Sequence, residues 1–505
     1  MSATLPRSSD VETRTLQNFV AGAWVESSAS EHLDVTNPAT AEVLARVPLS
    51  SAEDVQRAVD AARAAFPAWR SKSVIARSRL LYDVRQLLVD HQDELARIVT
   101  TEMGKTLPDA KAEVGRMIEM VEAACHTPTT MQGRNLENVA TAIDAETVRQ
   151  PVGVCAAIVP FNFPAMVPFW FLPFAVATGN TFILKPSEQV PLTQTRVFEL
   201  LEERGIFPPG VINLVNGGAD VVNAILDNPG IDAVSFVGSA RVAKHVYSRA
   251  AANGKRVQAL GGAKNHMVVM PDAVLDKTVD GIVGSAFGAA GQRCMAGSVV
   301  VTVGDVHGPL RDGLVEATKG LRVGNGLEDG VSVGPLVSCD ARDRVRGWID
   351  KGVEEGATLV VDGREPGANP DGAFVGPTIL DDVTPEMEVA REEIFGPVIS
   401  LMHVDTLDEA IGLVNSSRYG NGTSIFTENG AAVRKYRHDV EVGMIGVNIG
   451  VAAPVAFFPF SGWKDSFLGD THAHGTDAIE FYTRKKTITS RYYSAGETGK
   501  FFVEQ

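Results

Sequence analysis

The tetrapeptide Gly291-Gln292-Arg293-Cys294 is the segment of this sequence best suited to chemistry. A cysteine attacks electrophiles as its thiolate, and a neighbouring cation or helix end lowers the pKa of the thiol. Arg293 is the candidate for such a cation and would favour the thiolate of Cys294, although the side chains of adjacent residues often point apart. The alternative is a buried cysteine that packs as a small hydrophobe. Both interpretations stand for Cys294, and we expect the second for Cys125, Cys155 and Cys339.

A second chemical segment, Phe236-Val237-Gly238-Ser239, lies between a predicted strand and a predicted helix. The free N–H groups and the dipole at a helix start attract a pyrophosphate, so Ser239 is a candidate phosphate contact. The alternative is a glycine that only permits the turn. Neither G-x-G-x-x-G nor G-x-x-x-x-G-K-[ST] occurs in the chain, so the usual nucleotide fingerprints are missing.

The histidines and cysteines do not have the spacing of metal ligands. His472 and His474 are two residues apart without a nearby cysteine or carboxylate triad, and neither C-x-x-C nor H-E-x-x-H occurs. The sequence therefore predicts no metal site.

Short apolar strands alternate with helices around these segments, a pattern typical of a parallel sheet with right-handed crossovers. The predicted strands are Val154–Val159, Thr181–Leu184, Val211–Val215, Ala233–Val237, Arg256–Leu260 and His266–Met270. The predicted helices are Leu192–Arg204, Ala219–Leu226 and Arg241–Asn253. Cys294 follows a predicted helix over Gly284–Ala290 and precedes a predicted strand over Ser298–Val303. The chain is therefore expected to be an α/β protein.

The uncharged stretch Gln150–Leu184 is long enough to cross a bilayer. Prolines recur along it more often than a membrane helix tolerates, so we interpret it as the interior of an α/β domain.

Other segments extend this plan. Ala52–Gly104 has the apolar spacing typical of helices. We also predict a helix with a threonine cap over Thr406–Asn415 and a buried strand over Met444–Asn448. Arg134–Arg149 alternates like a strand pair, and Glu480–Ser490 like a single strand. Edge strands of this kind commonly pair with another subunit. The family resemblance described below, in which both segments match bridging strands, implies a homodimer or homotetramer.

Composition excludes several classes of protein. The chain has 505 residues and a formal charge of −16, which opposes binding to nucleic acid. Its 4 cysteines indicate free thiols in a reducing compartment. No secretory signal, transit peptide or lipidation motif is recognisable, so we expect a cytoplasmic protein without a membrane anchor.

Five motifs in order make the sequence resemble the aldehyde dehydrogenase superfamily along nearly its whole length. They are Pro160-Phe161-Asn162-Phe163-Pro164, Lys185-Pro186-Ser187-Glu188, Phe236-Val237-Gly238-Ser239, Gly291-Gln292-Arg293-Cys294 and Glu392-Glu393-Ile394-Phe395-Gly396-Pro397. The resemblance implies a Rossmann-like NAD domain, an α/β catalytic domain and a small β oligomerisation arm. It places the NAD domain at 12–130 and 151–260, the arm strands at 131–150, the catalytic domain at 261–465 and a C-terminal oligomerisation segment at 466–505.

The resemblance also implies residue roles. Cys294 is the nucleophile, and the Asn162 amide with the Cys294 backbone N–H forms the oxyanion hole. The residues implied to bind NAD are Phe161, Lys185, Glu188, Gly238, Ser239, Gly261, Glu393 and Phe395. A carboxylate at Glu188 would accept the ribose hydroxyl and repel a 2′-phosphate, which favours NAD over NADP.

One departure from the family pattern indicates which acceptor takes the acyl group from the thioester. Members that hydrolyse the thioester carry a glutamate base in E-L-G-G, where this chain has Ala259 or Leu260, depending on the alignment. Neither side chain can deprotonate water, whereas a thiol acceptor needs less help. The expected acceptor is therefore coenzyme A. A hydrolytic semialdehyde dehydrogenase, with water activated by Glu393 or unassisted, and a catalytically silent binding protein are the alternatives.

The sequence around these motifs resembles the CoA-acylating methylmalonate-semialdehyde dehydrogenases, most clearly in the segments Gln258–His266 and Phe460–Phe467. In that branch two arginines hold the substrate carboxylate, and Arg116 and Arg293 stand in the matching places. The alternative for Arg116 is a solvated helix charge beside Glu113 and Glu119. The resemblance implies oxidation and decarboxylation of malonate or methylmalonate semialdehyde to acetyl-CoA or propionyl-CoA.

Overall fold

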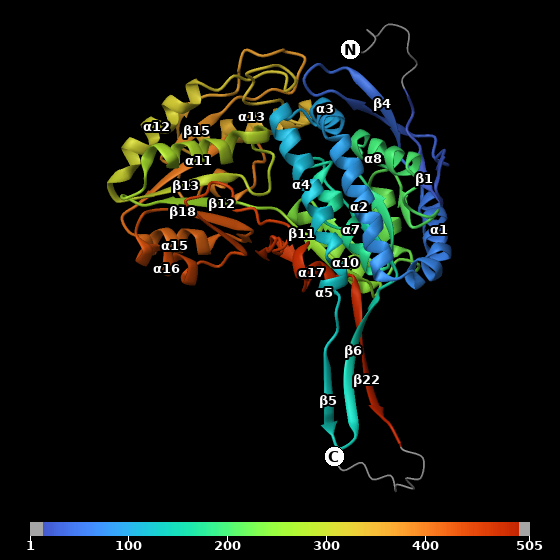
Figure 1. Ribbon diagram of the computed structural model, residues 1–505. Helices are drawn as coiled ribbons and strands as arrows, with labels where there is room; N and C mark the ends of the chain where they lie inside the picture. The colour runs from blue at the N-terminus through green and yellow to red at the C-terminus, as the bar shows by residue number, and fades with distance from the viewer. Residues whose placement is uncertain (1–13, 494–505) are drawn as a thin grey trace.

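A computed structural model describes residues 14–493, whose strands form two large sheets in two halves of the molecule (Figure 1). Within these residues, no helix combines the length and the apolar character needed to span a membrane. Three further strands project from the body as an arm. Small antiparallel pairs complete the strands: β3 (His32–Thr36) with β4 (Val43–Pro48), and β17 (Tyr419–Gly420) with β20 (Trp463–Lys464).

The first sheet has eight strands in the order β2-β1-β9-β8-β7-β10-β11-β21. The parallel strands are β7 (Val154–Ile158), β8 (Thr181–Lys185), β9 (Ile212–Leu214), β10 (Ala233–Val237) and β11 (Arg256–Leu260). The antiparallel edges are β1 (Asn18–Val20), β2 (Ala23–Val25) and β21 (Phe467–Leu468). The chain runs outward from β7 to β9 and then returns beside β7 with β10. The switch point therefore lies between β7 and β10, where open α/β sheets bind ligands at the carboxyl ends of their strands.

Helices cover both faces of this sheet. One face packs against α1 (Ala52–Ser71), α9 (Ala219–Asp227) and α10 (Ala240–Ala252). The other face packs against α2 (Val74–Asp90), α3 (Gln92–Met103), α4 (Leu107–Cys125), α6 (Met166–Phe169), α7 (Leu172–Thr178) and α8 (Leu192–Glu203). The short helix α5 (Thr127–Thr130) follows α4. The strands β10 and β11 confirm their predictions at both ends, and the uncharged stretch is buried domain interior.

The second sheet has seven strands in the order β14-β15-β16-β13-β12-β18-β19. Its strands are β12 (Asn265–Val269), β13 (Gly297–Val303), β14 (Thr358–Val361), β15 (Thr378–Asp381), β16 (Val398–Val404), β18 (Gly422–Phe426) and β19 (Met444–Val447). Its helices are α11 (Leu275–Phe287), α12 (His307–Lys319), α13 (Cys339–Glu354), α14 (Glu388–Arg391), α15 (Leu407–Ser416) and α16 (Gly430–Asp439). The predicted threonine cap is confirmed, because Thr406 and Glu409 form a reciprocal capping box at α15.

The arm consists of β5 (Asn135–Ala140), β6 (Ile143–Pro151) and β22 (Thr483–Arg491), and it extends well beyond the body in Figure 1. The predicted strand pair over Arg134–Arg149 is therefore confirmed. β22 pairs with β6 in antiparallel register, from Thr483 opposite Pro151 to Arg491 opposite Ile143. The residues of β5 are all exposed.

Three local predictions are wrong. The strand expected over Glu480–Ser490 begins only at Thr483, because α17 (Gly475–Phe481) continues to Phe481. The Arg256 guanidinium donates to the carbonyls of Glu480, Phe481 and Thr483, which satisfies the end of that helix.

The helix expected over Gly284–Ala290 ends at Phe287, because Ala289 and Ala290 adopt positive φ angles of 50° and 52°. This bend turns the chain toward Cys294. Cys339 is exposed at the start of α13 instead of packed, whereas Cys125 and Cys155 are buried as expected. The predicted domain boundaries stay a prediction, and their residues 12, 13 and 494–505 lie outside the described part of the chain.

Candidate active site

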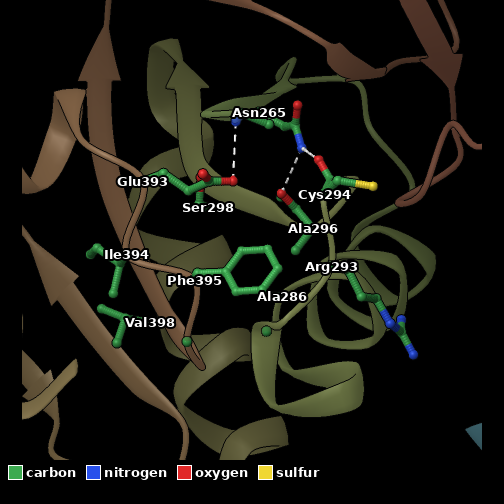
Figure 2. Close-up of a pocket in the computed structure, with 14 residues that line it drawn as sticks. Asn265, Ala286, Arg293, Cys294, Ala296, Ser298, Glu393, Ile394, Phe395 and Val398 are labelled. Carbon is green, nitrogen blue, oxygen red and sulfur yellow. Dashed lines mark hydrogen bonds between the residues drawn. The ribbon is translucent and has the colours of Figure 1, made fainter. Parts of the chain in front are cut away.

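Cys294 lies between the two sheets. The connection from β11 to β12 runs directly from the carboxyl edge of the first sheet to the amino edge of the second. Two side chains at that amino edge hold the Cys294 carbonyl: the amides of Asn265 and Asn421 each donate to it at 2.8 Å. Asn265 also donates to the Ala296 carbonyl at 2.9 Å, as Figure 2 shows. The peptide that carries the thiol is therefore fixed to the second sheet.

On one side of the thiol lies a cavity of about 330 Å³ at the switch point of the first sheet. Segments after β7 and β10 line it, together with loops and a helix of the half of the molecule that contains the second sheet. The predicted site residues in its wall are Phe161, Asn162, Gly238, Ser239, Gly261, Cys294, Glu393 and Phe395. The rings of Phe161 and Phe395 meet edge to face, with centroids 5.8 Å apart. Because the family resemblance implies that most of these residues bind NAD, we call this space the cofactor-side cavity.

Lys185 is the last residue of β8 and Glu188 follows that strand; neither lines the cofactor-side cavity. The Lys185 Nζ donates to Glu188 Oε2 at 2.6 Å, and the lysine is 4% exposed. Burial raises the pKa of Glu188, but the Lys185 ammonium outweighs burial and brings that pKa below its usual value. The pair therefore presents a carboxylate at the neighbouring strand end.

On another side of the thiol lies a cavity of about 280 Å³, lined by Cys294 with Arg116, Arg293 and mostly apolar side chains. We call it the substrate-side cavity. Arg293 donates to Asp109 at 2.8 Å and to the Gly284 carbonyl at 3.2 Å. Its guanidinium folds over Gly288, where a Cβ would come within 2.5 Å of it. Backbone and acidic partners therefore hold Arg293 at the cavity wall.

Arg116 donates to Glu119, which follows it on α4, and to the Pro454 carbonyl. The alternative of a helix charge beside Glu119 is therefore correct about that contact. The same guanidinium lies in the wall that contains Cys294, so the ion pair does not exclude a role in substrate binding. The two arginines are the cationic side chains in the lining of this cavity.

The Asn162 amide is oriented by the loop that carries the thiol. Its Nδ2 donates to the Gln292 carbonyl at 3.1 Å. Gln292 is 1% exposed and accepts at its side chain from the Val337 N–H at 3.0 Å. An amide nitrogen has two protons, so this bond fixes one and leaves the other for an oxygen beside Cys294.

The thiol is protonated at neutral pH in this structure. Burial raises the pKa of Cys294 to about 12, and the Glu393 carboxylate adds to the increase. The backbone N–H groups of Cys294 and Met295, and then Arg293, act in the opposite direction. The expectation that Arg293 favours the thiolate is therefore correct in sign, but burial and Glu393 outweigh it.

Glu393 is the acidic side chain shared by the cofactor-side cavity and the space behind Cys294. It accepts from the Ala263 N–H at 3.0 Å, and burial raises its pKa to about 7. Ala259 and Leu260, which occupy the two possible positions of the family's glutamate base, are 0% and 5% exposed in β11. Neither lines the cavities that contain Cys294.

Sequence reasoning missed several residues of this site. Asp109 and Glu113 were not assigned; they stand at i and i+4 on α4, with the predicted Arg116 at i+7, and the three line the substrate-side cavity together. That spacing places side chains on one face of a helix, so it was a usable signal. Glu113 forms an ion pair with Lys105. The sequence around Lys105 contains no motif that would have identified this lysine.

Two ring nitrogens in the substrate-side wall also escaped prediction. Trp170 Nε1 and His474 Nδ1 are buried without a hydrogen-bond partner in the described part of the chain, and their rings lie 5.5 Å apart. Burial lowers the pKa of His474 to about 3, so its imidazole is neutral. Apart from Arg116, Arg293 and the acidic Asp109 and Glu113, the cavity is therefore lined by uncharged side chains, several of them aromatic.

The aldehyde dehydrogenase family model matches residues 24–488. The chain is 52% identical over 477 residues to a malonate-semialdehyde dehydrogenase of Halalkalibacterium halodurans, covering 94% of this chain and 98% of that protein. It is also 52% identical over 493 residues to malonate-semialdehyde dehydrogenase 1 of Geobacillus kaustophilus, covering 97% and 100%.

Two solved structures are also similar to this chain over most of its length. The methylmalonate-semialdehyde dehydrogenase of Oceanimonas doudoroffii superposes with a TM-score of 0.94 at 44% identity, covering 96% of this chain and 99% of the other. A Sinorhizobium meliloti protein assigned to the same activity, in complex with NAD, gives 0.94 at 43% identity, covering 96% and 100%.

The pKa values of this site predict how fast Cys294 is alkylated. Glu393 becomes charged above about pH 7 and disfavours the thiolate, so E393Q should alkylate faster than wild type at pH 9, by about threefold to tenfold. At pH 6, where Glu393 is protonated, the two rates should converge. Iodoacetamide labelling of Cys294, followed by peptide mass spectrometry, measures this ratio.

The matched control is E392Q, because Glu392 forms its ion pair with Arg418 at 2.9 Å and does not line the cavities beside Cys294. Its labelling rate should equal that of wild type. Equal rates in E393Q and wild type at pH 9 would show that Glu393 does not influence the thiol.

Proposed function

The chain belongs to the aldehyde dehydrogenase family, and we propose that it oxidises and decarboxylates malonate semialdehyde or its methyl homologue with NAD and coenzyme A. The product is acetyl-CoA or propionyl-CoA. One observation carries the proposal: Cys294 lines both the cofactor-side cavity and a cavity whose cations are Arg116 and Arg293. A nucleophile and a carboxylate-binding pair therefore meet in one place.

The cofactor-side cavity has the groups that a dinucleotide requires. Helix α10 begins at Ala240 beside this cavity, and the Ser239 side chain makes no capping bond, so free N–H groups are available to a pyrophosphate. Phe161 and Phe395 supply an apolar wall, and Glu393 a carboxylate acceptor for ribose hydroxyls. When bound, NAD accepts the hydride that leaves the substrate carbon.

Thioester formation begins when the Cys294 thiol loses its proton to solvent and the resulting thiolate attacks the aldehyde carbon. The electrons of the carbonyl bond move to oxygen, and the resulting alkoxide needs fixed donors. The second N–H of the Asn162 amide and the backbone N–H of Cys294 are the donors we assign. Loss of hydride re-forms the carbonyl and leaves the substrate acyl group on the Cys294 sulfur.

Decarboxylation follows from the position of the substrate carboxylate, which lies β to the new thioester carbonyl. When the bond to the carboxylate carbon breaks, its electrons form an enolate whose oxygen occupies the same donors. A proton from solvent then completes the acyl group. Arg116 and Arg293 orient the carboxylate, but a stronger hold would oppose its conversion to neutral CO₂, since only differential binding of the transition state speeds a step.

The acceptor of the acyl group is the coenzyme A thiol in this proposal. Its thiolate displaces Cys294 and regenerates the enzyme. Ala259 and Leu260 cannot deprotonate water, whereas a thiol is partly ionised near neutral pH without assistance. Glu393, with its pKa near 7, is the group that would support hydrolysis instead.

We also propose that the arm joins copies of this chain. The residues of β5 are all exposed at the edge of the three-stranded sheet, which leaves backbone groups available to a second copy. The described cysteines are free thiols, which fits a reducing, cytoplasmic compartment.

Steady-state formation of NADH with malonate semialdehyde tests the acceptor. We expect the rate to increase at least about tenfold when coenzyme A is added, because deacylation by water lacks a dedicated base. Rates measured with and without coenzyme A in wild type and E393Q separate the two chemistries. A rate that is independent of coenzyme A and lost in E393Q would establish the hydrolytic dehydrogenase instead.

Substitution of the arginines tests the substrate. R116L and R293L should each raise KM for malonate semialdehyde by about tenfold or more, since each charge-assisted hydrogen bond contributes about 1.5–3 kcal/mol. KM for propanal, which has no carboxylate, should change by less than about threefold. The matched control is R97L, at an exposed position of α3. Equal losses with both substrates would contradict the assignment.

A further inference from the structure

A buried ion pair lies beneath the segment that carries Asn162. Lys105 follows the left-handed cap Gly104 at the end of α3, and Glu113 stands on α4. Their side chains are both 0% exposed, and Nζ lies 2.5 Å from Oε2. Burying two charges away from water is costly unless further hydrogen bonds satisfy them. The other contacts of Lys105 and Glu113 therefore identify the segment that this ion pair binds.

Those contacts all go to residues 162–166. Lys105 Nζ donates to the Asn162 carbonyl at 2.7 Å and lies 4.0 Å above the centre of the Phe163 ring. Glu113 Oε1 accepts from the Ala165 N–H at 2.8 Å and the Met166 N–H at 3.1 Å. One ion pair therefore binds both ends of this segment.

The segment has little regular structure of its own. It leaves β7 after Ile158 and enters α6, which is only four residues long. The side chain of Asn162 is held by the Gln292 carbonyl, and its backbone by Lys105. The ion pair fixes the backbone from which the Asn162 amide projects toward Cys294.

Glu102 shows that a buried carboxylate near this region need not act on the site. It is also 0% exposed, and it accepts from the N–H groups of Leu192 and Thr193 at the start of α8. It does not line the cavities that contain Cys294. Glu102 therefore provides a comparison for burial without contact to the 162–166 segment.

We propose that Lys105 and Glu113 are positioning residues that hold the Asn162 amide at the site of the developing alkoxide and thereby set the rate of thioester formation. This inference rests on the proposed function, in which Asn162 is an oxyanion donor. Small displacements of a catalytic donor cost large factors in rate, because donors act only when fixed in place before the charge forms.

A double-mutant cycle tests the inference. The variant K105M/E113Q keeps the approximate size of both side chains. Because it removes both charges together, no buried charge is left unpaired. The pre-steady-state rate of NADH formation from propanal, at saturating aldehyde and per Cys294 thiol, should fall about tenfold to a hundredfold. In an N162A background the same double substitution should change that rate by less than about threefold, since the donor is already absent.

Alkylation of Cys294 separates positioning from general damage to the fold. Iodoacetamide reacts without forming an alkoxide, so its rate should be the same in K105M/E113Q and wild type. E102Q should leave both alkylation and the propanal rate unchanged. An equal fall in the N162A and wild-type backgrounds, or a parallel fall in alkylation, would overturn the inference.

E113D serves as a second variant if the double substitution prevents folding. It keeps the charge pair but withdraws the carboxylate from Ala165 and Met166, so an intermediate loss of the propanal rate with unchanged KM is expected. An unchanged propanal rate in E113D would contradict the inference.

Oxidation of propanal requires neither the arginines nor decarboxylation. Wild type that forms no NADH from propanal would count against the proposed function, whereas a rate loss in K105M/E113Q independent of Asn162 counts against this inference alone.

Discussion

The fixed position of the Cys294 peptide is the constraint on which the site depends. Asn265 and Asn421, both at the amino edge of the second sheet, donate to the Cys294 carbonyl. The Asn162 amide reaches the same loop from the carboxyl edge of the first sheet. The thiol therefore has a fixed place between two sheets, and a cavity opens on either side of it. In the proposed function, this geometry separates the cofactor from the substrate.

Charge adds a second requirement. The chain carries a formal charge of −16, and each proposed ligand is an anion or contains phosphate, so the overall field opposes their capture. Attraction must come from local groups: the start of α10 for a pyrophosphate, and Arg116 with Arg293 for a carboxylate. Glu119 and Asp109 form ion pairs with Arg116 and Arg293 and orient them. In the proposed function, these ion pairs also weaken the binding of a carboxylate that must leave as CO₂.

Much of this arrangement was predictable from the sequence. Strands such as β10 and β11 were predicted to the residue, because buried parallel strands are short apolar runs between clear turns. The residues around Cys294 were found because they belong to linear motifs. Lys105 and Glu113 were not, because their function arises from contacts with a segment about fifty residues away. The raised pKa of Cys294 was also beyond the sequence, since burial outweighs its neighbour Arg293.

Product analysis tests the central claim most directly. The enzyme would be supplied with NAD, coenzyme A and malonate semialdehyde carrying ¹³C in its carboxylate, and the products identified by mass spectrometry. The account predicts unlabelled acetyl-CoA, ¹³CO₂ and one NADH for each acetyl-CoA. Labelled malonate released without consumption of coenzyme A would contradict both the acyl transfer and the decarboxylation assigned to this site.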